Sequence, residues 1–113
     1  MSGNAVTAGF VRVCSVDDLP KVGAVQAEIA GKKIAVVRDS AGGVHAIDDT
    51  CSHANVSLSE GDVEKGEIEC WLHGSRFDLR SGKPTGPPAI IPIAVYTVKI
   101  DGDDVFVSVT KEN

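Results

Sequence analysis

Several protein classes depend on residues that this chain of 113 amino acids has in short supply. Its three cysteines are too few, and odd in number, for a secreted scaffold held by disulfides. Acidic residues (16) outnumber lysine and arginine (11), so the net charge is −5, whereas binding to a nucleic-acid backbone needs a basic face. Disulfide scaffolds and phosphate-backbone binders are therefore excluded.

Long apolar segments are also missing. The longest run of apolar residues and proline covers residues 87–96, and its prolines interrupt a stretch already too short to cross a bilayer. The first ten residues have neither the basic nor the apolar region of a signal peptide. We therefore expect a cytoplasmic protein without a membrane anchor, whose cysteines are reduced thiols or metal ligands.

The remaining composition is that of a folded protein, with 42% hydrophobic and 24% charged residues. The length suits a single domain over residues 1–113. Short apolar runs separated by turn residues predict β-strands, and no segment keeps a helical period over three turns. The expected strands cover residues 10–14, 24–29, 33–38, 44–47, 95–100 and 105–109.

Two local signals support this assignment. Asp101-Gly102 lies between two alternating runs, which is a strong hairpin signal. Residues 15–20 suit one capped helical turn that ends at Pro20. We therefore predict an all-β sandwich or small barrel.

The middle of the chain differs from the flanking parts. Residues 49–90 are rich in glycine, serine, proline and charge, with short apolar stretches only at 68–72 and 77–79. A long irregular segment in a small domain is usually functional or disordered. We expect the chemistry of the protein to reside here.

This segment holds two of the three cysteines and two of the three histidines, in the pattern C-x-H-x16-C-x2-H. The four residues are Cys51, His53, Cys70 and His73. Thiolate and imidazole are ligands of zinc and of iron–sulfur clusters. Paired ligands of structural zinc are usually two to four residues apart, whereas only one residue separates Cys51 from His53. Side chains at i and i+2 project the same way and reach two adjacent metal atoms, so the spacing favours a binuclear cluster over a zinc-stabilised binding module.

With these four residues the chain resembles the Rieske [2Fe–2S] family, most specifically over residues 49–92. Gly74 follows the last histidine as in the family, and residues 81–88 resemble its proline-rich covering loop. The resemblance implies one [2Fe–2S] cluster per chain, with Cys51 and Cys70 on one iron and His53 and His73 on the other. It also implies an antiparallel, sandwich-like β base and a cluster-binding subdomain, about residues 49–90, with two ligand loops and a proline-rich loop.

Departures from the family's subtypes narrow the function. Val56 and Leu72 stand where respiratory members carry a disulfide, and only His45 remains for the two-histidine iron site of an oxygenase. The resemblance thus implies an electron-transfer component rather than an enzyme. The chain is similar to the ferredoxins that carry electrons from a flavin-dependent NAD(P)H reductase to a terminal oxygenase. A small subunit of assimilatory nitrite reductase and a ferredoxin linked to cluster assembly remain alternatives.

Four neighbours of the ligands have expected roles. High-potential members carry a serine and a tyrosine hydroxyl after the last histidine, and here Ser75 is present but Phe77 replaces the tyrosine. We therefore predict a potential in the lower part of the Rieske range of about −150 to +300 mV. Ser75 serves equally well as a turn residue. Trp71 is expected to pack under the cluster rather than face a partner, and Pro87 to shield it.

The other cysteine and histidine are not expected to be ligands. Cys14 lies in a predicted strand and suits a buried apolar position. His45 alternates within a predicted strand and suits a structural or surface role.

The negative charge is concentrated in the segment that carries the motif. Residues 48–69 carry a net charge of −6, residues 70–88 carry +2, and the rest of the chain −1. Such a charge either keeps the protein soluble or steers basic partners toward this segment. Salt-dependent electron transfer would distinguish the second role.

Overall fold

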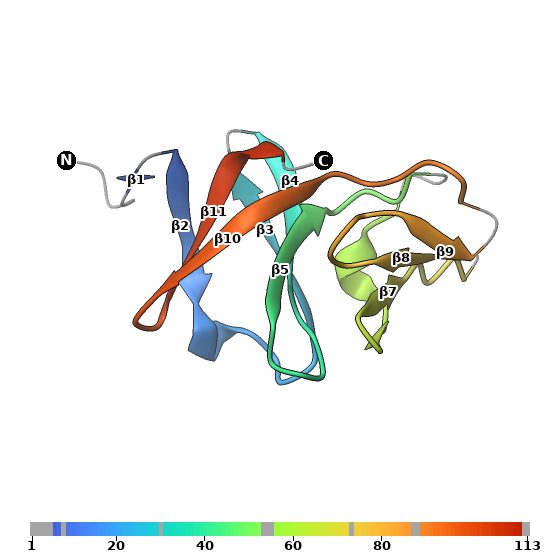
Figure 1. Cartoon of the computed structure of the whole chain (residues 1–113), viewed down its shortest axis with the longest axis horizontal. Helices are drawn as coiled ribbons and strands as arrows, with labels where there is room; N and C mark the ends of the chain where they lie inside the picture. The colour runs from blue at the N-terminus through green and yellow to red at the C-terminus, as the bar shows by residue number, and fades with distance from the viewer. Residues whose placement is uncertain are drawn as a thin grey trace.

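The computed structural model describes residues 6–7, 9–29, 31–52, 56–72, 74–86 and 89–111, arranged as two antiparallel sheets (Figure 1). The larger sheet forms the base of the molecule, and the smaller sheet lies beside it in a lobe that carries the two predicted ligand loops, which we call the first and second ligand loops. In the described part of the chain, no helix is both long and apolar enough to cross a membrane. The strands of the base are β1 (Val6–Thr7), β2 (Phe10–Ser15), β3 (Gly23–Ile29), β4 (Lys32–Arg38), β5 (Val44–Asp48), β10 (Val95–Asp101) and β11 (Asp104–Lys111).

The base confirms the predicted strands. Its order is β1-β2-β11-β10-β5-β4-β3, and all its neighbours run antiparallel. The hairpin predicted at Asp101-Gly102 joins β10 to β11, and Gly102 has the positive φ (62°) that such a turn requires. The predicted helical turn is a 3₁₀ turn, η1 (Val16–Asp18), with a capping box between Ser15 and Asp18.

The sheet curls so that its two ends approach each other. One buried cluster around Leu19, Val36 and Val105 also takes in Val13 from β2 and Val25 from β3, although these strands lie near opposite ends of the strand order. The base is thus a partly closed barrel with an apolar interior.

Strand β4 explains how the base and the lobe are joined. Its residues Ile34, Ala35, Val36 and Val37 are all buried, so the run is continuously apolar rather than alternating. Ile34 and Val36 belong to clusters within the base, whereas Ala35 and Val37 belong to the cluster that fills the lobe. The outer face of β4, with Ala35 and Val37, therefore packs against the buried residues of the lobe.

The lobe is more regular than the sequence suggested. Its sheet has the order β6-β7-β8-β9, and a 3₁₀ turn, η2 (Leu58–Glu60), precedes it. The expectation of an irregular segment over residues 49–90 was therefore wrong for these strands and η2, because strands of two or three residues are too short to show an alternating pattern. The strands are β6 (Val63–Glu64), β7 (Glu67–Glu69), β8 (Arg76–Asp78) and β9 (Pro84–Gly86).

Candidate iron–sulfur site

The first ligand loop leaves the base at the end of β5 and is closed at its neck. The Cys51 N–H donates to the Val56 carbonyl (3.0 Å), and Thr50 forms a β-bridge with Ser57. Just below, the Leu58 N–H donates to the Asp49 carbonyl (2.5 Å). These bonds hold Cys51 in the neck of the loop.

The second ligand loop connects β7 to β8. The pairing of Glu69 with Arg76 extends by one step, because the Cys70 N–H donates to the Ser75 carbonyl (2.6 Å). The Gly74 N–H turns back to the Cys70 carbonyl (2.9 Å), and Gly74 has a φ of 78° that favours glycine. Cys70 therefore lies at the start of a tight hairpin loop.

A third loop, after β9, is bound to both ligand loops. The Ala89 N–H donates to Ser75 Oγ (3.0 Å) in the second loop, and Ser52 Oγ in the first loop donates to the Ile91 carbonyl (2.6 Å). The sequence predicts the covering loop at residues 81–88, but residues 84–86 form β9, and the loop that contacts both ligand loops follows that strand. We call this later loop the covering loop. Pro87 itself lies outside the described residues, so its shielding role stays a prediction.

The two cysteine side chains lie in one apolar core. Cys51 is 3% exposed and Cys70 is fully buried, and both belong to the cluster that joins the lobe to β4 and β5. Thiolates in such surroundings are soft ligands shielded from water, which suits an iron–sulfur cluster. His53 and His73 lie outside the described residues, and the described residues alone contain no group of three metal-ligating side chains.

Ser75 and Phe77 are both fully buried beside these loops. Ser75 Oγ accepts the Ala89 N–H, so this serine holds the covering loop in place. Phe77 belongs to the same apolar core as Cys51 and Cys70, where its ring contributes no hydroxyl. The structure therefore gives Ser75 a linking role beyond its own turn.

The expectation that Trp71 packs under the cluster is wrong. Its side chain is 51% exposed. The preceding residue, Cys70, turns its side chain into the core, and the chain then bends outward through Trp71 and Leu72, which is also exposed. Trp71 therefore belongs to the surface.

Exposed apolar side chains gather on these loops. Six large hydrophobic residues of the described chain are exposed, and four of them lie on the second ligand loop or the covering loop. The most exposed is Ile90, at 84%. We call Trp71, Leu72, Ile90 and Ile91 the apolar rim.

The acidic segment has fewer free charges than its composition suggests. Arg76 Nε binds Glu67 (2.7 Å), and its Nη1 approaches Glu69 (3.4 Å). Tyr96 donates its hydroxyl to Asp48 (2.7 Å). The exposed acids of residues 48–69 are Glu60, Asp62 and Glu64, on and next to η2 and β6.

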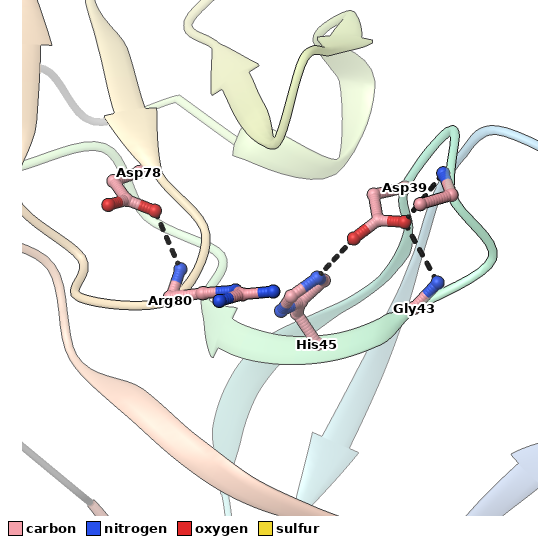
Figure 2. Close-up of polar contacts among 6 residues, drawn as sticks. Asp39, Gly43, His45, Asp78 and Arg80 are labelled. Atoms are coloured by element: carbon pink, nitrogen blue, oxygen red, sulfur yellow. Dashed lines mark hydrogen bonds and ion pairs between the residues drawn. The ribbon is translucent and has the colours of Figure 1, made fainter.

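His45 takes the structural role predicted for it. Its Nε2 lies 2.7 Å from Asp39 Oδ2, and the Ala41 and Gly43 N–H groups donate to Asp39 Oδ1 (Figure 2). The hydrogen bond from His45 is the main cause that lowers the pKa of Asp39. His45 lines a hollow of about 430 Å³ between the β4–β5 turn and the lobe, and the Arg80 side chain extends toward it from the lobe.

Cys14 also fits its prediction. It lies in β2, partly buried against a cluster of the base, and burial raises the pKa of its thiol. A thiol with a raised pKa is a poor nucleophile and a poor ligand.

Some residues of the site were missed from the sequence. Asp49 enters the sequence analysis only through the net charge of residues 48–69, yet it is 1% exposed, and no local pattern distinguishes it from Asp48. Burial alone would raise the pKa of Asp49, but hydrogen bonds from Gln26 and Ser59 outweigh it and lower that pKa. Ile90-Ile91, two adjacent large apolar residues flanked by prolines in the run 87–96, were a signal that could have indicated the rim.

Comparison with known proteins gives consistent matches over nearly the whole chain. The family model for the Rieske [2Fe–2S] domain matches residues 9–107. The biphenyl dioxygenase ferredoxin subunit of Pseudomonas sp. (strain KKS102) is 38% identical over 103 residues, which cover 90% of this chain and 94% of that protein.

Two solved structures match the fold closely. The ferredoxin of carbazole 1,9a-dioxygenase from Nocardioides aromaticivorans IC177 superposes with a TM-score of 0.84 at 38% identity, covering 89% of this chain and 98% of that one. A ferredoxin-sized chain in a complex of reduced oxygenase and oxidized ferredoxin in carbazole 1,9a-dioxygenase superposes with a TM-score of 0.86 at 30% identity, covering 95% and 99%.

Proposed function

This chain belongs to the Rieske [2Fe–2S] family and holds one such cluster, and on that premise we propose that it is a ferredoxin carrying single electrons from a flavoprotein reductase to a terminal oxygenase. The observation that carries the proposal is the apolar rim around the ligand loops. Family membership also sets aside the alternative of a zinc-stabilised module. The relatives' names, which are those of dioxygenase ferredoxins, favour an oxygenase over a nitrite reductase as acceptor.

Cys51 and Cys70 hold one iron in this proposal, and His53 and His73 hold the other. The burial of both thiols in one apolar core supports the cysteine pair. The cluster, when bound, supplies reversible one-electron chemistry at a potential that the surrounding charge and hydrogen bonds tune. The closed necks of the two loops keep the thiols in place between redox states.

The apolar rim is the docking face for the partner. Trp71 and Leu72 lie on the Cys70 loop itself, and Ile90 and Ile91 lie on the covering loop, which is hydrogen-bonded to the Cys51 and Cys70 loops. A protein that covers the rim therefore approaches the cluster closely. Exposed apolar side chains gathered in one place mark interaction sites. The solved complex of a similar ferredoxin with its oxygenase supports a partner of this kind.

Glu60, Asp62 and Glu64 give the lobe a negative electrostatic field that can steer a partner. They are the exposed acids of the segment and have no basic partner among the described ion pairs. A group of exposed negative charges speeds the approach of a basic partner. Salt screens this attraction, since the Debye length is about 8 Å at physiological ionic strength. Turnover should therefore fall as salt rises.

Reconstituted turnover tests the proposal. The purified ferredoxin is combined with an NADH-dependent flavoprotein reductase and an aromatic-ring dioxygenase, and product is measured against ferredoxin concentration. We expect Ile90→Gln to raise the apparent KM for ferredoxin severalfold without changing the midpoint potential. The matched control is Ile100→Gln, an exposed isoleucine of the β10 end of the base, which should leave both values unchanged.

Two results would count against the proposal. Equal KM values for the two variants would remove the rim as the docking face. A purified protein that does not turn red-brown, or whose visible absorbance does not bleach with dithionite, would contradict electron carriage itself.

A further inference from the structure

Asp49 is a buried acid at the root of the first ligand loop. It is 1% exposed, and Ser75 is the other buried polar residue in the described part of the chain. Its Oδ2 accepts Gln26 Nε2 from β3 (2.6 Å), and its Oδ1 accepts the Ser59 N–H (2.8 Å). Its own N–H donates to the Lys33 carbonyl on β4 (3.1 Å), and its carbonyl accepts the Leu58 N–H.

These bonds make Asp49 the clamp of the loop. The Leu58 and Ser59 bonds join the two ends of residues 49–59, the stretch that carries Cys51 and His53. The Gln26 and Lys33 bonds attach the same point to the base. The position of Cys51 therefore depends on the bonds of Asp49.

Asp49 also places a negative charge near the cluster. Both carboxylate oxygens accept hydrogen bonds from nitrogen donors, which is the pattern of an ionised carboxylate. Two residues of extended chain span at most about 7 Å, so Asp49 and Cys51 are close neighbours. A buried charge is screened much less than an exposed one.

We propose that Asp49 is a positioning residue that clamps the Cys51 loop and, through its buried charge, lowers the reduction potential of the cluster. Reduction adds a negative charge to the cluster, and a fixed like charge nearby makes that step less favourable. The inference rests on the proposed role of Cys51 as a ligand. It does not depend on the identity of the redox partner.

Redox titration of the purified holoprotein tests the charge. Asp49→Asn keeps the size of the side chain and an oxygen that accepts the Ser59 N–H, but removes the charge. A unit charge within roughly 12 Å, at an effective dielectric constant of about 20, changes the equilibrium constant for reduction about tenfold. We expect the constant to rise by about this factor, with the reduced-state EPR spectrum unchanged.

Asp48→Asn is the matched control. Asp48 is the adjacent acid, but it is partly exposed and binds Tyr96 on the base instead of closing the loop. Its replacement should shift the potential much less. Equal potentials in Asp49→Asn and the wild type would overturn the electrostatic part of the proposal, and so would an equal shift in the two variants.

Two further variants keep the test decisive if Asp49→Asn binds the cluster poorly. Gln26→Lys replaces the amide donor with a cation beside the intact carboxylate, and it should also raise the potential. Asp49→Ala removes the clamp and should lower the iron content per chain well below that of Asp49→Asn. Full occupancy in Asp49→Ala would overturn the positioning role, and an unchanged potential in Gln26→Lys would overturn the charge effect. Wild-type protein without any cluster would instead contradict the proposed function.

Discussion

The base and the lobe are stabilised in different ways. Strands of the base run to eight residues and pair over long registers, such as the seven consecutive pairs between β3 and β4. Strands of the lobe have two or three residues, and its loops are held by individual hydrogen bonds that the Ser52 side chain donates and the Ser75 and Asp49 side chains accept. Among the described residues, the buried side chains of the lobe form no separate core, since they share one cluster with β4 and β5.

The difference indicates that the base supplies structural support and the lobe supplies the cluster-binding loops. The base is a rigid wall that folds through strand pairing, and the lobe is assembled on its outer face. Sparse pairing lets the lobe hold two short loops close together. The stability of the lobe then depends on the cluster, on the shared core and on single hydrogen bonds. Substitutions in the lobe should therefore affect cluster retention, and matched substitutions in the base should not.

The largest contrast should come from the cysteines. Cys70→Ala removes a proposed ligand from the lobe core, and we expect loss of the visible absorbance and of most bound iron. Cys14→Ala, in β2 of the base, should leave the iron content unchanged. Iron and sulfide analysis of both variants checks this, and a fully occupied cluster in Cys70→Ala would break the assignment.

Gly61 tests the close packing between the segment after the first loop and β7. A Cβ at Gly61 would collide with the Glu69 carbonyl oxygen, next to Cys70, so the backbone would have to move. We expect Gly61→Ala to destabilise the lobe by about 3 kcal/mol, at the upper end of overpacking effects, and to lower cluster retention. Gly86→Ala in β9 meets nothing within 4 Å and serves as the control. Native-state hydrogen exchange of the lobe amides measures the difference, and equal behaviour of both variants would contradict the account.

Val36 and Val37 test the two faces of β4. Both are fully buried, but Val36 faces the interior of the base and Val37 faces the lobe. Truncation of either to alanine should cost about 2 kcal/mol. Only Val37→Ala should speed the release of iron to a chelator. If Val36→Ala sped it equally, the base and the lobe would not be separable.

Substitutions at Ser75 and Ser52 compare the loss of a buried hydrogen bond with the loss of an exposed one. Ser75→Ala leaves the buried Ala89 N–H without an acceptor, which should cost about 1–3 kcal/mol of local stability. Ser52→Ala frees the Ile91 carbonyl, which water reaches from the exposed loop, so the effect should be smaller. Exchange rates of the Ala89 amide in the two variants check the order, and a larger effect of Ser52→Ala would contradict it.

The smallest effect belongs to the turn of the base at Asp39. Because His45 and two backbone N–H groups hold the pKa of Asp39 below its usual value, the carboxylate stabilises the turn above the unfolded pKa of about 3.9. That stabilisation, under about 1 kcal/mol for a group near the surface, is lost as the pH falls through the folded pKa. NMR of the Ala41 and Gly43 amides should show a transition centred below pH 3.9 that disappears in Asp39→Asn. A midpoint above pH 3.9 would mean that folding raises the pKa of Asp39, which would contradict the stabilising role of its carboxylate.

The base could be predicted from the sequence because its strands are long enough to show alternation, and β10 and β11 flank a strong turn signal. The ligand pattern was also visible, since two cysteines and two histidines fall in two short segments of a chain poor in both. The short strands β6–β9 could not be predicted, because two or three residues are too few to show an alternating pattern, although their partners lie close in sequence. Trp71 was misjudged and Asp49 was missed because only the tertiary packing decides which of two neighbouring side chains turns inward.

The most direct test of the account is pulsed EPR of the dithionite-reduced holoprotein. We expect a [2Fe–2S] signal with couplings to two histidine ¹⁴N nuclei, one of which is lost in each of His53→Cys and His73→Cys. A reduced cluster without nitrogen coupling, or couplings unchanged in both variants, would contradict the assignment of Cys51, His53, Cys70 and His73 as its ligands.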